Sequence, residues 1–102
     1  MRTLLQVSMD VNAANRAIRD GQMQKTVDSM MTLLKPEAAY FTTVRGKRTA
    51  LIIFDLKDPS MIPQIAEPFF DTLAAEVDFQ PVMNREELIK GLKSIQGGQK
   101  AA

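Results

Sequence analysis

The sequence predicts an α+β protein built around one four-stranded antiparallel sheet. The run from Arg48 to Leu56 is β-rich and apolar on both faces, which is typical of a central strand that is covered on both sides. Residues 12–34 and 58–73 instead repeat apolar side chains at helical spacing. Gly46 and Lys47 separate two strand-like runs by a tight reversal, which predicts a β-hairpin of antiparallel neighbours.

The expected elements alternate in type along the chain. We expect strands over residues 2–9, 38–44, 48–56 and 77–83. The first helical region changes the phase of its apolar stripe near Gly21, so we expect a short helix, a break and a longer helix that ends at Lys35-Pro36. The second helical region, residues 58–73, carries an apolar stripe that we expect to be buried: Ile62, Ile65, Ala66, Phe69 and Leu73.

Polar residues at the helix starts support these boundaries. Asp10 or Asn12 is the expected N-cap of the first helix, and Asp58 or Ser60 that of the second helical region. Asn84 precedes two glutamates, so it is expected to cap a short terminal helix over residues 85–95.

The resulting order is β-α-β-β-α-β plus a terminal helix, which is the ferredoxin-like arrangement with helices on one face of the sheet. In that topology the first and third strands are central. We expect a single domain over residues 1–96 and a disordered tail over residues 97–102, which offers nothing to bury.

Composition restricts the possible chemistry. The chain has 102 residues, a net charge of +1, no histidine and no cysteine. Catalysis would therefore depend on carboxylates, lysines, hydroxyls, the single Tyr40 or a borrowed cofactor. We expect neither a metal site nor a cofactor of the protein's own. The sequence lacks the basic excess that is typical of nucleic-acid-binding proteins. No apolar run approaches the roughly 18 residues of a membrane span. We expect a cytoplasmic protein.

Three stretches carry a resemblance to a known family: Leu34 to Phe41, Gly46 to Ala50, and Asp58 to Phe70. They resemble a family of uncharacterised bacterial proteins of roughly a hundred residues. That family is similar to the dimeric α/β-barrel proteins, which include antibiotic-biosynthesis monooxygenases and muconolactone-isomerase-like enzymes. The resemblance covers most of the chain and implies a homodimer. It implies no catalytic residues.

The sheet face away from the helices is the expected functional surface. Strand alternation places apolar and polar side chains there together. The apolar members are Leu4, Val44, Leu51 and Ile53, and the polar members are Gln6, Ser8, Tyr40, Thr42, Asp55, Asp78 and Gln80. An uncovered apolar face of this kind predicts a homodimer through the helix-free sheet face.

Two interpretations of the polar set remain open. In one, Gln6, Ser8, Tyr40, Thr42 and Asp55 line a small-molecule site inside the dimer. In the other, the same groups form hydrogen bonds across an interface or lie at its rim. We accordingly expect a binding or interaction module, with a small-molecule enzyme that uses a carboxylate and Tyr40 as the alternative. Asp55 is the preferred base, and loss of hydration would raise its pKa.

Two polar clusters have simpler interpretations. Asn15, Arg19 and Asp20 flank the helix break, where such residues usually cap helix ends, although an anion site is the alternative. The run from Arg45 to Arg48 forms a basic hairpin tip without aromatic neighbours, which indicates a solvated turn rather than a nucleic-acid contact.

Overall fold

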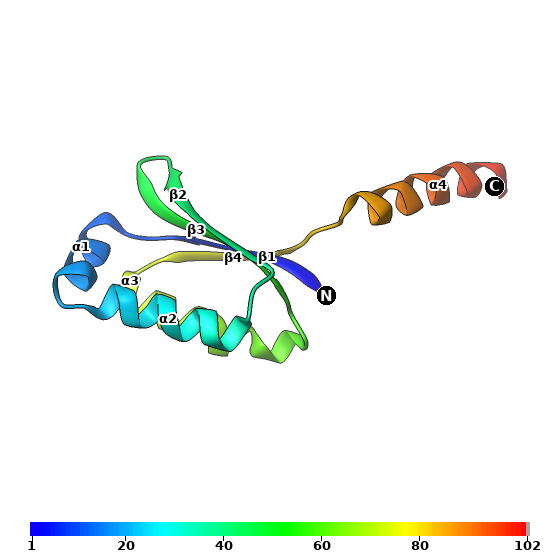
Figure 1. Ribbon diagram of the computed structural model, residues 1–102. Coiled ribbons are helices and arrows are strands. Elements are labelled where there is room, and N and C mark those ends of the chain that lie inside the picture. Colours follow the sequence, from blue (N-terminus) through cyan, green and yellow to red (C-terminus); the bar gives the residue numbers. More distant parts are fainter. Residues whose placement is uncertain (102) are drawn as a thin grey trace.

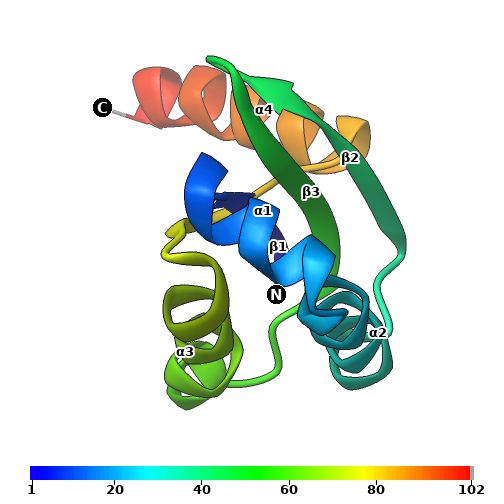
Figure 2. The ribbon, with the colours of Figure 1, turned by 90° about the vertical axis from the view of Figure 1, so that its left-hand side faces the viewer.

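The computed structural model describes the backbone of residues 1–101 and the side chains of residues 1–96. The elements in chain order are β1 (Arg2–Ser8), α1 (Val11–Arg19), α2 (Gln22–Leu34), β2 (Ala38–Val44), β3 (Lys47–Asp55), a 3-10 turn (Pro59–Met61), α3 (Ile62–Leu73), β4 (Glu76–Pro81) and α4 (Arg85–Ala101). The predicted α+β class is confirmed. Figures 1 and 2 show α1, α2 and α3 together on one side of the sheet.

The four strands form one antiparallel sheet in the order β2-β3-β1-β4. This arrangement is consistent with the ferredoxin-like topology. The central position predicted for the strand from Arg48 to Leu56 is confirmed, because β3 lies between β2 and β1. The helices cover only one of its faces, however, so Leu51 and Ile53 remain half-buried.

The core lies between the sheet and the three helices. The central strands contribute alternate residues, among them Leu5, Val7, Ile52 and Phe54, which are at most 2% exposed. From α3, Ile65, Phe69 and Leu73 pack against them, as the predicted stripe requires, and Met30 of α2 and Ala14 of α1 complete the cluster. Burial of these apolar side chains supplies the main stabilisation of the fold.

The predicted helix break is confirmed. Gly21 separates α1 from α2 and has φ of 81°, a left-handed conformation that glycine adopts at little cost. Asp10 is the N-cap of α1, because its carboxylate accepts a hydrogen bond from the Ala13 amide at 2.9 Å. Asp58 likewise caps the 3-10 turn by accepting from the Ser60 amide at 2.8 Å.

The terminal helix α4 projects away from the sheet and the other helices (Figure 1). The Asn84 side chain accepts from the Glu87 amide at 2.8 Å and the Glu87 side chain from the Asn84 amide at 2.9 Å, so the two residues form a capping box at its start. The predicted end near Ile95 is wrong, since α4 continues to Ala101. The side chains of residues 97–102, where a disordered tail is predicted, lie outside the described residues, so the disorder of the tail stays a prediction.

Within the described part of the chain, no helix is both long enough and apolar enough to cross a bilayer.

Candidate functional site

The helix-free face of the sheet is organised into cross-strand rows, because directly paired residues share a face. One row contains Tyr40, Leu51, Gln6 and Asp78. The adjacent row toward the hairpin contains Thr42, Thr49, Ser8 and Glu76. The next row in the other direction contains Ala38, Ile53, Leu4 and Gln80.

Four of the five predicted ligand residues therefore lie in two adjacent rows. Gln6 and Ser8 on β1 also line a hollow of about 330 Å³ together with Asp78 and Lys47. Tyr40 and Thr42 lie on the edge strand β2, where the Tyr40 side chain is 67% exposed. This part of the predicted set is brought together on one surface.

Asp55 lies apart from the other four residues. It pairs with Arg2 at the far end of β3, four residues beyond Leu51, the residue opposite Tyr40. At about 3.3 Å per residue this separation is roughly 13 Å. Asp78 is paired directly with Gln6 and so lies beside it, but β4 and β2 are the opposite edges of the sheet, so Asp78 and Tyr40 lie at the two ends of their row.

The expected rise in the pKa of Asp55 is wrong. Its carboxylate accepts a hydrogen bond from Lys57 Nζ at 2.7 Å and another from the Met1 ammonium at 2.6 Å. These two cations, Lys57 foremost, hold the pKa of Asp55 down at about 2. The side chain is exposed, so the dehydration that would raise the pKa is too weak to compete.

This ion pair gives a direct prediction for NMR. Titration of the Asp55 carboxyl carbon should give a pKa of about 2, and Lys57→Met should move that pKa upward. Because the folded-state pKa is lowered, any contribution to stability is present above the unfolded-state value and is lost as the pH falls through about 2. A wild-type pKa near ~3.9, the value of a free aspartate, would contradict the pairing.

Apolar side chains occupy the centre of the helix-free face. Leu4 of β1 is paired directly with Ile53 of β3, and Leu51 lies in the adjacent row. All three are half-buried, although α1, α2 and α3 lie on the other side of the sheet. The apolar band, as we call Leu4, Leu51 and Ile53, therefore remains accessible to a second molecule.

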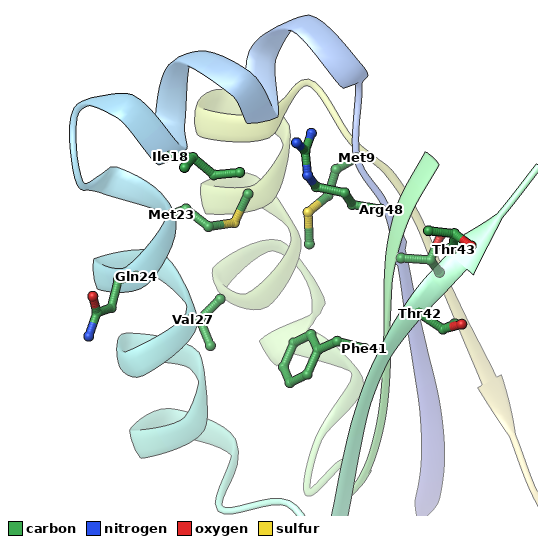
Figure 3. A pocket seen from close by; sticks show the side chains of 10 residues that line it. Met9, Ile18, Met23, Gln24, Val27, Phe41, Thr42, Thr43 and Arg48 are labelled. Atoms are coloured by element: carbon green, nitrogen blue, oxygen red, sulfur yellow. The ribbon is translucent and has the colours of Figure 1, made fainter. Parts of the chain in front are cut away.

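A larger cavity, of about 550 Å³, lies on the opposite side of the sheet, between the helices and the β2–β3 hairpin. Figure 3 shows Ile18, Met23 and Val27 of α1 and α2 facing Phe41 of β2 across it. The cavity lies where the edge strand β2 meets the margin of the core: Ala39 packs against the core cluster, but no residue of β2 is fully buried. We call it the hairpin cavity.

Arg48 lies at one end of the hairpin cavity, next to Met9 (Figure 3). The interpretation of the whole run from Arg45 to Arg48 as a solvated turn is wrong for Arg48, whose side chain is half-buried. Its Nη2 donates a hydrogen bond to Asn15 Oδ1 of α1 at 3.0 Å. Asn15 thus orients Arg48, whereas Asp20 has the expected capping role and accepts from the Gln22 amide at 3.0 Å.

Neither surface contains a metal site: among the residues that the structure describes, no three acidic side chains are grouped closely enough to hold an ion. Comparison of the chain with known protein families gives no match, and no curated protein matches it. The class that the fold defines is an α+β domain with one covered and one open sheet face.

Proposed function

We propose that this protein is a homodimeric binding module whose two copies pair through their helix-free sheet faces. The apolar band is the observation that carries this proposal. Leu51 and Ile53 belong to the central strand β3 and Leu4 to the central strand β1, so the band lies in the middle of the sheet and not at its margin. Apolar side chains at such a position favour an interface.

Two-fold pairing suits this surface because a C2 interface uses the same patch on both copies. The polar rows beside the band then lie inside or at the rim of the dimer. Gln6, Ser8 and Tyr40 would provide hydrogen-bonding groups there, and Asp78 a carboxylate, for a small molecule held between the sheets. Membership of the dimeric α/β-barrel proteins and a cytoplasmic location belong to the same proposal.

The helix α4 offers a second apolar surface to the partner copy. Leu88, Leu92 and Ile95 are 44%, 47% and 59% exposed, and their spacing of four and three residues places them on one side of the helix. The Arg2 guanidinium bonds to Glu87, which ties the first turn of α4 to the sheet. Lys90 and Lys93, further along α4, are positively charged. They complement the negative charges of Glu76 and Asp78 on the open face.

The catalytic alternative gains no comparable support. It requires a carboxylate that accepts a proton near neutral pH close to Tyr40. Asp55 is instead paired with Lys57, holds a pKa of about 2 and lies in a different row from Tyr40. We therefore favour binding over catalysis.

The mass of the protein in solution tests the proposal. Sedimentation velocity at micromolar concentration should give twice the 11.4 kDa of one chain. Dilution should reveal a reversible monomer. A mass that stays at one chain up to a hundred micromolar would reject the dimer.

A further inference from the structure

The hairpin cavity lies outside the proposed dimer interface, since it opens on the helix side of the sheet. Its volume of about 550 Å³ falls within the range of roughly 300–1,000 Å³ found for small-molecule sites. The surface that lines it is mainly apolar, and Arg48 is the single charged residue of the lining. The residues that line the cavity are Met9, Ile18, Met23, Gln24, Val27, Phe41, Thr42, Thr43, Arg48 and Thr49.

The walls are suited to an apolar body of adaptable shape. Ile18 and Phe41 are 49% and 56% exposed, so a ligand between them would remove apolar surface from water. Met9 and Met23 contribute flexible thioethers, which adjust to ligands of different outline. Gln24 and Thr42 point away from the space in Figure 3. The centre of the cavity therefore offers few polar partners.

Arg48 adds a single polar anchor at the end of this apolar space. The described chain gives it a neutral partner, the Asn15 amide, and places no carboxylate within ion-pair distance of it. A guanidinium carries five N–H donors, so several remain after the bond to Asn15. The bond fixes the position of the guanidinium, and the charge beside apolar walls favours an anion.

We propose that the hairpin cavity binds an organic carboxylate with an apolar chain or ring. The carboxylate pairs with the Arg48 guanidinium, and the apolar body lies between Phe41 and the side chains of Met23 and Val27. A monoanion is favoured over a phosphate group because the lining contains one cation. Lys47, the residue before Arg48 on β3, is paired with Glu76 at 3.4 Å and lies on the other face of the sheet.

The site also differs in kind from the polar rows of the helix-free face. There, polar groups from several strands surround apolar side chains, whereas here one charge ends an apolar space. Occupancy of the hairpin cavity should therefore be independent of dimer formation. A variant that dissociates the dimer, such as Leu51→Lys, is expected to bind the carboxylate with unchanged affinity.

Isothermal titration calorimetry with the full chain tests the proposal, with decanoate as the probe at pH 7 and below its micelle-forming concentration. Decanol, which has the same chain but no charge, is the matched ligand. Decanoate should bind saturably and more tightly than decanol. Arg48→Met should weaken decanoate binding by roughly 10- to 100-fold, the effect of losing one or two hydrogen bonds to a charged group, and leave decanol unchanged.

Arg45→Met is the control variant, because Arg45 is exposed in the hairpin turn and does not line the cavity. It should bind decanoate as the wild type does. Phe41→Ala, at an exposed position outside the buried core, should weaken the binding of both ligands. The comparison of decanoate with decanol on the wild-type chain tests the charge even if Arg48→Met fails to fold.

The proposal is overturned if decanoate shows no saturable binding, if decanol binds equally well, or if Arg45→Met reduces affinity as much as Arg48→Met. Methyl NMR gives the location. Decanoate should shift the Met9 and Met23 methyl signals, which belong to the cavity lining. Shifts confined to residues of the helix-free face, such as Leu4 and Leu51, would place the carboxylate elsewhere and also contradict the proposal.

Discussion

Replacement of Phe69 by alanine is expected to lower the free energy of unfolding by about 3–5 kcal/mol, the usual cost of truncating a buried aromatic side chain. Phe69 is 2% exposed and packs in the core between α3 and the sheet. Removal of the ring loses its burial and leaves a cavity that the close-packed surroundings fill only partly. Chemical denaturation followed by circular dichroism measures the change.

Phe70 provides the matched control in the same helix. It is 45% exposed, so Phe70→Ala should cost less than about 1 kcal/mol, as surface substitutions usually do. The two variants must be compared at the same protein concentration, because a dimer gains apparent stability by mass action. Equal losses for the two variants would show that α3 does not bury the face described here.

The second large effect is expected at the proposed interface. Leu51→Lys should convert the dimer to monomer at micromolar concentration, because charges buried in an interface without partners cost several kcal/mol. Each dimer carries the substitution twice. Leu51 is half-buried on the open face, so in the monomer the long lysine side chain can extend to water and the domain should stay folded. Sedimentation velocity and circular dichroism measure the two properties.

Leu33→Lys is the control for this experiment. Leu33 is 36% exposed on α2, on the helix side of the molecule and away from the apolar band. A charge there should leave the dimer intact. If Leu51→Lys and Leu33→Lys both keep the wild-type mass, the sheet face is not the interface. An unfolded Leu51→Lys chain would show instead that Leu51 belongs to the monomer core.

Most of the fold could be predicted because its signals are local. Strand alternation and helical spacing depend on a few consecutive residues, so β2 was predicted with its observed bounds and β1 and β3 to within one residue. The end of α4 was missed because Gly97 and Gly98 reduce helix propensity without preventing a helix. Propensity alone is a weak guide at such a boundary.

The candidate site was predicted less completely because it depends on register. Asp55, Tyr40 and Gln6 were expected together because alternation places them on one face. Position along the strand separates Asp55 from Tyr40 and Gln6, and the pairing of Gln6 with Asp78 places that carboxylate beside Gln6. Alternation determines the face of a residue but not its distance from another residue on that face.

Arg48 shows the same division between sequence and structure. Its place two residues before Ala50 and four before Ile52 put it on the helix-facing side, and this alternation was visible in the sequence. The hairpin cavity was not, because it results from the distance between the edge strand β2 and the helix α2, which only packing determines.

The sequence by itself determined the element types, the faces of the sheet and the exclusion of histidine and thiol chemistry, since these follow from residue identity and local period. Only the tertiary structure decided that Asp55 is paired with Lys57, that Arg48 is hydrogen-bonded to Asn15 and that α4 projects away from the sheet. Each of these features depends on how elements that are distant in the chain approach one another. The local pattern of residues contains no information about the distance between such elements.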